Sequence, residues 1–371
     1  MSLKCQEELQ RGLENCLQTL TGVIKTVVSM KAVQIHQHGG PEVLKYEEVA
    51  DPICGSGDVL VQLKAASINH LDLWVRQGIP GWKVSLPLTP GCDGAGVVAG
   101  KGELIKDLNV GDKVLVIPNV SCGNCEYCVN GDDNLCPEYG IVGETCNGCD
   151  AEMIALPRRN IIPIPKGLTY EEAAAIPLVF MTAWHMLVTK AQVKPEQFVL
   201  VLAAGSGVGS AAIQIAKLHG AKVIATAGND AKLEKAKGLG ADFLINHYKE
   251  PISEMVKQYT ENRGVDVVVE HVGKATWEES LKSLAKGGKI VTCGATTGSE
   301  VSINLNYIFY KHQQIIGSTM STRGELFEIL NFVRQKKLKP VIDKEFMLKE
   351  VADAHRYVAE GKQFGKVILT I

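Results

Sequence analysis

The sequence lacks the features that mark membrane, secreted or nucleic-acid-binding proteins. No apolar run approaches the roughly 20 residues that a membrane-spanning helix needs, and no segment resembles a signal peptide. The formal net charge of −2 gives no reason to expect binding to nucleic acid or to a membrane surface. Eleven cysteines without a signal peptide predict reduced thiols and metal ligands rather than a disulfide framework. We therefore expect a cytoplasmic protein.

Internal repeats and low-complexity linkers are also missing, and the 371 residues suggest two domains with ample core. Residues 1–29 differ in pattern from the residues after them. Their apolar residues recur at helical spacing, which predicts a short amphipathic helix: Leu9, Leu13, Leu17, Leu20 and Ile24. Interspersed glutamates argue against a transit peptide. We interpret this N-terminal extension as an appended segment or as a packing and oligomer element.

The rest of the chain shows two different patterns of apolar residues. From residue 30 onward, short apolar or alternating runs separated by glycine- and proline-rich turns predict an antiparallel, partly barrel-like β domain. From about residue 170 to 317, strand-length apolar runs alternate with helical segments, as in a parallel sheet covered on both faces. The last segment, 366–371, is expected to form a strand that returns to the first domain.

The clearest single motif lies at residues 198–218. An apolar run too short for a buried helix leads into Gly205, Gly207 and Gly209, and a helical period comes next. Without a Cβ, these glycines let a pyrophosphate approach the backbone, and the helix N-terminus favours its charge. The stretch predicts a dinucleotide-binding strand, turn and helix. A purely structural turn is the alternative.

A second motif is a cysteine cluster in a polar loop. Its four members are spaced C-x2-C-x2-C-x7-C and are Cys122, Cys125, Cys128 and Cys136. Four thiolates close a tetrahedral zinc site with no open position, so we predict a structural zinc rather than a catalytic one. An iron–sulfur cluster and unligated cysteines are the alternatives. Cys146 and Cys149 have no second pair and are interpreted as ordinary thiols.

With these motifs, the chain resembles the medium-chain dehydrogenase/reductase superfamily of zinc-type alcohol dehydrogenases and quinone reductases. The resemblance covers about residues 30–371 and includes segments 91–98, 111–114, 177–184, 203–209 and 361–367. It implies an α/β fold with a GroES-like β domain (30–178 and 318–371) carrying the zinc lobe at about 121–137. A Rossmann doubly wound parallel-sheet domain (179–317) interrupts it. A homodimer or homotetramer is also implied.

The chain lacks most ligands of the catalytic zinc found in zinc alcohol dehydrogenases. By resemblance, those positions read Asn69, Cys92 and Leu178, of which only Cys92 is a good ligand. A catalytic zinc needs three protein ligands and an open place, so a site improvised from Cys92 with His70 or Asp93 is the less favoured alternative. Residues 69–72 and 76–78 instead resemble the zinc-independent quinone reductases. This implies that Asn69 lies near the nicotinamide ring and the substrate carbonyl.

The second Rossmann strand lacks the acidic residue that usually binds the ribose of NAD. Small residues stand there, and Lys232 follows at the position that resembles a 2′-phosphate ligand. NADP(H) is therefore expected, although Asp230 leaves NAD open as the alternative. The residues that the resemblance implies for cofactor binding are Thr182, Gly205, Ser206, Gly207, Val208, Gly209, Asn229, Lys232, Gly294 and Lys366.

The hypothesis is an NADPH-dependent reductase of a quinone, enone or similar activated double bond, with one structural zinc and no catalytic zinc. Without a Lewis acid, a hydrogen-bond donor such as Asn69 would stabilise the substrate oxygen, and Asp72 and His70 are the nearby acids. An alcohol or aldehyde dehydrogenase with an irregular Cys92 zinc site is one alternative. A non-enzymatic NADPH-binding sensor is another. A small apolar substrate bearing a carbonyl is expected, and the candidate lining residues are Ile68, Trp74, Trp82 and Phe180, with Tyr307 and Tyr310 unplaced.

Overall fold

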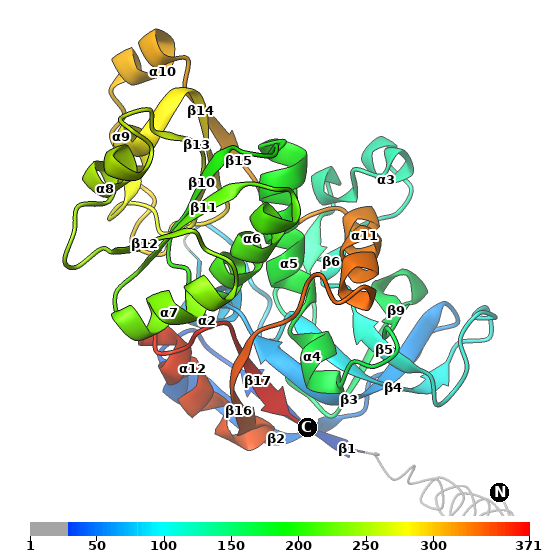
Figure 1. Ribbon diagram of the computed structural model, residues 1–371. Helices are drawn as coiled ribbons and strands as arrows, with labels where there is room; N and C mark the ends of the chain where they lie inside the picture. The colour runs from blue at the N-terminus through cyan, green and yellow to red at the C-terminus, as the bar shows by residue number, and fades with distance from the viewer. Residues whose placement is uncertain (1–28, 80) are drawn as a thin grey trace, which may run out of the picture.

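The structure is a computed structural model that describes residues 29–79 and 81–371. The helix expected within residues 1–29 lies outside the described residues except for Ser29, where the first strand begins. No helix in the described part of the chain is long and apolar enough to cross a membrane. Two large β-sheets organise the rest (Figure 1).

The first sheet combines strands from both ends of the chain. Its order is β16 (Ile342–Met347), β17 (Lys366–Thr370), β3 (Asp58–Ile68), β4 (Asp93–Lys101), β5 (Lys113–Val116) and β9 (Ile161–Pro163), with β8 (Met153–Pro157) also paired to β3. As expected, the C-terminal strand returns to this part of the molecule: β17 runs antiparallel to β3, with Val367 opposite Ile68 (Figure 1). A separate antiparallel pair is formed by β1 (Ser29–Ile35) and β2 (Leu44–Ala50).

The pattern of β3 explains how this sheet reaches the interior. Val59, Val61 and Leu63 alternate with more exposed residues, as in a strand with one face on a core. From Ala65 to Ile68 every residue is buried, because α4 (Tyr170–Ala174) packs against the strand here. The strand therefore ends deep inside the molecule, immediately before α2 (His70–Gln77).

The second sheet is parallel and has the order β12 (Phe243–Asn246), β11 (Lys222–Ala227), β10 (Phe198–Val201), β13 (Val265–Glu270), β14 (Leu284–Thr292) and β15 (Gln314–Gly317). The chain order reverses between β10 and β13, which is the Rossmann arrangement and confirms the predicted fold class. The helices associated with it are α5 (Pro177–Trp184), α6 (Gly207–Leu218), α7 (Asp230–Gly238), α8 (Ile252–Tyr259), α9 (Trp277–Ser283) and α10 (Leu305–Lys311).

The remaining elements belong to neither large sheet. They are the π-helix η4 (His185–Lys190), α11 (Arg323–Arg334), α12 (Val351–Ala359), and the zinc-lobe elements β6 (Asn119–Val120), α3 (Glu126–Asn130), η2 (Asp133–Leu135) and β7 (Gly140–Ile141), with short 3-10 turns η1 (Pro41–Val43), η3 (Arg158–Asn160) and η5 (Leu348–Glu350). One apolar core includes residues of both sheets, such as Leu115, Val201 and Ile368, together with Phe180 and Met181 of α5. This shared core fixes the β domain against the Rossmann sheet.

Two local features were not anticipated. Helix α9 ends at Ser283 and β14 begins at once at Leu284, where a bulge lets Leu284 pair with Val265. Gly287, with φ +74°, permits that irregular backbone. Strand β16 was not anticipated, because three charged residues interrupt its apolar pattern; it pairs in parallel with β17.

Candidate active site

The order of the parallel strands reverses between β10 and β13. The loops after β10 and β13 meet there, and the Ser206 hydroxyl lies 3.1 Å from Nε2 of His271. Burial, reinforced by the charge of His70, lowers the pKa of His271 to about 4, so its ring is neutral at pH 7. Ligands of open α/β sheets bind at such a reversal, because neighbouring loops diverge there.

The glycine turn at this point has the predicted shape. Ser206 caps α6 by accepting a 2.8 Å hydrogen bond from the Gly209 amide, and Val208 packs on the core from the first turn. A Cβ on Gly209 would lie 2.5 Å from the Ala203 carbonyl oxygen, and one on Gly207 would lie 2.7 Å from the Val179 side chain. Only glycine keeps this turn close to the helix N-terminus, where a pyrophosphate would be favoured.

A buried polar cluster lies beneath the N-terminus of α2. The Lys366 ammonium donates to Asn69 Oδ1 at 2.5 Å, to the Ile68 carbonyl at 3.0 Å and to Asp93 Oδ2 at 3.3 Å. Asn69 in turn donates from Nδ2 to Asp93 at 2.8 Å, and the Leu178 amide donates to the other Asp93 oxygen at 3.0 Å. Asn69 is therefore held rigidly, and Lys366 acts on it directly. The lysine stem also lies 3.1 Å from the Cβ position of Gly207, beside the turn.

A carboxyl–thiol pair adjoins this cluster. Asp72 Oδ2 accepts a 2.7 Å hydrogen bond from the backbone amide of Asn69, and Asp72 Oδ1 accepts one of 3.0 Å from the Cys92 thiol. Burial raises the pKa of Asp72 to about 6, although these donors and Lys366 favour its ionised form. Burial and the neighbouring Asp72 charge raise the pKa of Cys92 well above its ordinary value, so the thiol stays protonated.

His70 and Trp74 on α2 lie near the loops that follow β13 and β14. Their rings pack edge to face at 5.2 Å, and Trp74 lies 3.3 Å from the Cβ position of Gly294. Burial lowers the pKa of His70, so it is a poor proton donor at pH 7. Thr182, also predicted for this region, donates to the Leu178 carbonyl at 2.7 Å.

An apolar wall beside Cys92 was not anticipated. Cys92 packs with Ile141 and Met320, and the partly buried residues in contact with this group are Leu71, Tyr139 and Leu178. Met320 has a φ of +29°, a conformation that is uncommon for a residue with a side chain. The sequence carried no signal for this wall, because its members lie in five separate segments that only the fold brings together. It offers an apolar surface beside the polar cluster.

The region after β11 bears on the choice of cofactor. The Lys232 side chain lies 3.0 Å from the Cβ position of Gly205, and its ammonium donates to the Gly361 carbonyl. Asn229 caps α7, accepting from the Lys232 amide at 2.9 Å. Asp230 is engaged elsewhere: it accepts at 2.6 Å from both Asn246 and Lys249.

The four loop cysteines meet as the spacing predicted. Their sulfur atoms all lie within 4.8 Å of one another, with 3.5 Å between Cys122 and Cys136 and 3.9 Å between Cys122 and Cys128. Tetrahedral zinc with bonds of about 2.3 Å places its sulfurs about 3.8 Å apart. Amides of Cys122, Gly123 and Glu138 point at these sulfurs from 3.3 to 3.4 Å, as they do toward thiolates. The donor set fits a structural zinc.

The residues around Cys92 do not fit a catalytic zinc. Leu178 offers no ligand atom, and Asn69 and Asp93 are occupied by Lys366 and by each other. Across the described ranges, the loop cysteines are the only place where three or more cysteine, histidine or carboxylate ligand atoms converge. The alternative of an improvised zinc on Cys92 with His70 or Asp93 thus finds no support in the donor geometry.

Several expected lining residues lie elsewhere. Ile68 and Phe180 belong to the two main apolar cores, and Trp82 is largely exposed. Tyr307 and Tyr310 are on α10, far from α2 in Figure 1, where lysines pack over their rings. Of the four apolar candidates, Trp74 lies beside Gly294 in the loop after β14.

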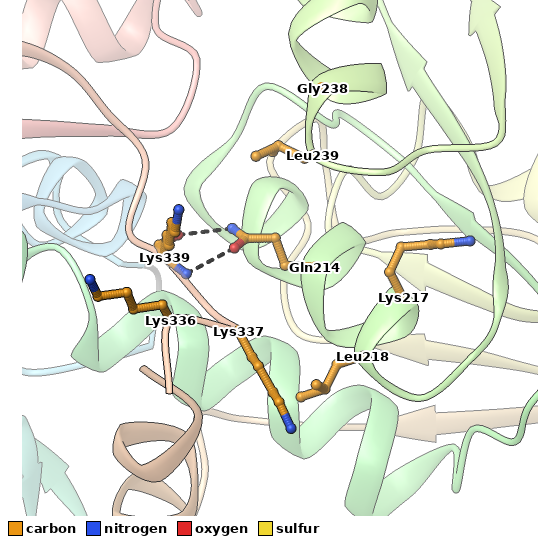
Figure 2. A pocket seen from close by; sticks show the side chains of 8 residues that line it. All are labelled: Gln214, Lys217, Leu218, Gly238, Leu239, Lys336, Lys337 and Lys339. Atoms are coloured by element: carbon orange, nitrogen blue, oxygen red, sulfur yellow. Dashed lines mark hydrogen bonds between the residues drawn. The ribbon is translucent and has the colours of Figure 1, made fainter. Parts of the chain in front are cut away.

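A hollow of about 260 Å³ lies away from this site, between α6, the end of α7 and residues 336–339. Gln214 holds its wall by hydrogen bonds of 2.9 and 3.0 Å to the Lys339 backbone. In Figure 2 the ammonium groups around it point in different directions rather than at one point. The hollow therefore lacks the convergent groups of a binding site.

The chain is similar in sequence and structure to known dehydrogenases and reductases. Residues 55–166 match the family model of the alcohol dehydrogenase GroES-like domain, and residues 207–335 match that of the zinc-binding dehydrogenases. An alcohol dehydrogenase of Geobacillus stearothermophilus is 35% identical (92% of this chain, 100% of that protein). A quinone oxidoreductase of Homo sapiens is 30% identical (92% and 98%). A crystal structure described as an NAD-dependent alcohol dehydrogenase is 48% identical, with a TM-score of 0.89 (92% and 100%).

Proposed function

Because the chain belongs to the medium-chain dehydrogenase/reductase superfamily, as an NAD(P)-dependent oxidoreductase, we propose that it reduces a quinone, an enone or a similar activated double bond with NADPH. The observation that carries this proposal is the donor set around Cys92, which cannot assemble three metal ligands. Oxidising an alcohol without a Lewis acid is difficult, because the hydroxyl must lose its proton. Reducing an already polarised double bond requires only hydride at carbon and stabilisation of the oxygen.

The proposed roles follow the contacts of the buried cluster. Bound nicotinamide supplies the hydride. Lys366 and Asp93 fix the Asn69 amide, whose second N–H has only a 3.4 Å contact with the Ser67 carbonyl. That N–H is the proposed donor to the substrate oxygen. The apolar wall of Cys92, Ile141 and Met320 would receive the apolar part of the substrate.

NADPH is proposed over NADH because of the surroundings of Lys232. The end of β11 is neutral, and the carboxylate of Asp230 is already paired with Lys249. An ammonium beside a neutral loop favours a 2′-phosphate, which a free carboxylate would repel. The residues proposed to hold the cofactor are Thr182, Gly205, Ser206, Gly207, Val208, Gly209, Asn229, Lys232 and Gly294. Lys366 was also expected to bind the cofactor, but its ammonium is bonded to Asn69, so its proposed role is to position that side chain.

A second candidate is an NAD-dependent alcohol dehydrogenase, favoured by the names of the Geobacillus protein and of the 48% identical structure. One experiment separates the two. Absorbance at the NADPH band is followed with a panel of quinones and enones, and NAD(P)+ reduction is followed with primary and secondary alcohols. We expect turnover only in the first assay, with a lower KM for NADPH than for NADH. Alcohol oxidation with NAD+ would establish the second candidate, and tight NADPH binding without turnover would indicate a sensor.

A further inference from the structure

Glu144 is a buried acid that the proposed reaction does not yet use. It follows β7 in a tight turn, where the Glu144 and Thr145 amides both donate to the Ile141 carbonyl at 3.0 Å. The residue is only 3% exposed. Its Oε1 atom has no hydrogen-bond partner among the described residues. A buried carboxyl group with an unpaired oxygen is costly as an anion, which favours the protonated acid.

The turn that carries Glu144 is pressed against the residue preceding Cys92. A Cβ on Gly143 would lie 2.6 Å from the Gly91 carbonyl oxygen, and one on Gly148 would lie 2.3 Å from it. The Cys149 amide donates to the same carbonyl at 2.8 Å. Ile141, whose carbonyl accepts the hydrogen bond from the Glu144 backbone amide, packs directly on Cys92 and Met320. The turn that carries Glu144 therefore lies beside the apolar wall.

The other acids of the site are poorly suited to giving up a proton at neutral pH. Asp72 accepts two hydrogen bonds that favour its carboxylate. The Cys92 thiol has its pKa raised well above the ordinary value, and the His70 ring is neutral. Burial, reinforced by the charge of Asp72, raises the pKa of Glu144 to about 7. The titratable groups of the elements around it are Asp72 on α2, Cys92 and Asp93 at the start of β4, Tyr139 beside β7, and Cys146, Cys149 and Asp150 on its own segment.

We propose that Glu144 is the proton donor that completes the reduction of a conjugated double bond, an assignment that rests on the proposed function. Hydride adds to the β-carbon of the enone and leaves an enolate. The O–H bond of the Glu144 carboxyl group then breaks, and its proton bonds to the α-carbon. The Glu144 carboxylate regains a proton from water. The sum is one hydride and one proton added across the double bond, which narrows the substrate class to enones and related conjugated carbonyl compounds.

The test compares wild type with Glu144→Gln, which keeps the shape but has no acidic proton, with Glu144→Asp as the conservative variant. For the wild type, kcat for an enone should fall as pH rises through about 7, because the donor must be protonated. Glu144→Gln should lower kcat by about 10²-fold and remove that pH dependence, while Glu144→Asp restores part of both. In D2O the wild type should deliver deuterium to one face of the α-carbon, and Glu144→Gln should lose this selectivity.

Glu152→Gln, further along the same segment, is the matched control and should leave rate and selectivity unchanged. Infrared spectra of the cofactor-free protein provide a readout independent of turnover: a protonated-carboxyl band should disappear between pH 6 and 8 in wild type and be missing from Glu144→Gln. An unchanged pH profile and unchanged facial selectivity in Glu144→Gln would overturn the assignment while leaving enone reduction intact. A wild type that reduces no enone would overturn the assignment together with the proposed function.

Discussion

The Lys366 ammonium lies 2.5 Å from the side-chain oxygen of Asn69, although 297 residues separate them in the chain. Both groups are buried, and Asp93 lies within 3.3 Å of the same ammonium. Strand β17, the last strand of the chain, thus sets the orientation of the side-chain amide of Asn69, the residue that caps α2. This contact joins the C-terminal strand to the proposed reaction centre.

Lys366→Met should therefore impair both stability and turnover. It leaves the Asp93 carboxylate buried without its cation, which we expect to cost about 3–5 kcal/mol of unfolding free energy. The Asn69 amide also loses the donor that fixes it, so kcat should fall more than cofactor affinity. Urea denaturation and steady-state kinetics measure the two effects. Lys362→Met, in an exposed pair with Glu360, is the control and should change neither. Equal stability of the two variants would refute the buried pair.

Loss of zinc should destabilise the zinc lobe at residues 121–137 and helix α11, which contacts it. The Asp133 carboxylate accepts a 3.0 Å hydrogen bond from the Arg323 amide, and Asn134 lies 3.3 Å from the buried His185 ring. Chelation or Cys128→Ser should lower Tm by about 5 °C or more, because the metal links four loop positions. Elemental analysis with calorimetry checks this, and we expect one zinc per chain. Two zinc ions per chain, or a melt that chelation leaves unchanged, would contradict the assignment.

Local signals predicted much of this molecule, and long-range contacts account for the rest. The glycines around Gly207, the cap at Asn229 and the spacing of the cysteines each encode their geometry within a few residues. Lys366 was expected to hold the cofactor, yet its ammonium turns inward to Asn69, a contact that no local pattern reveals. Glu144 was missed for the same reason, since its burial depends on a turn packing against Gly91.

Lys232→Ala tests the choice of cofactor. Removing one charge-assisted contact to a 2′-phosphate should raise the KM for NADPH by about tenfold, while the KM for NADH stays nearly constant. Initial rates with both cofactors measure this. Lys235→Ala is the control on the same helix, because Lys235 pairs with Asp343 at 3.2 Å. A wild type that prefers NADH, or equal changes for both cofactors, would rule out the role of Lys232.

Acid should destabilise the protein through His355. Burial, reinforced by the charge of Arg76, lowers the pKa of His355 to about 3 in the folded state, against 6.5 as the ordinary value. As pH falls below 6.5, His355 is protonated in the unfolded chain but stays neutral in the folded chain. The free energy of unfolding therefore decreases progressively between pH 6.5 and about 3. The slope approaches about 1.4 kcal/mol per pH unit.

His355→Gln should flatten that slope, because glutamine does not titrate and still offers an oxygen to Arg76. Urea midpoints at pH 7, 6 and 5 measure it. His36→Gln, at an exposed position, provides the control. If both variants keep the wild-type slope, another group governs the acid sensitivity.

The β15 edge of the Rossmann sheet, which no other strand of the described residues pairs with, should hold two chains together. Strand β15 ends the sheet, and α10 beside it exposes Leu305, Phe309 and Tyr310 by 69%, 66% and 71%. Apolar side chains next to an open strand edge favour association with a second copy, which agrees with the oligomer expected from the resemblance. Light scattering should give at least twice the chain mass for wild type and a smaller mass for Phe309→Asp. Ile53→Asp, which is 91% exposed on the β domain, should stay oligomeric. A monomeric wild type, or a Phe309→Asp variant that associates as tightly as Ile53→Asp, would show that this edge does not join the chains.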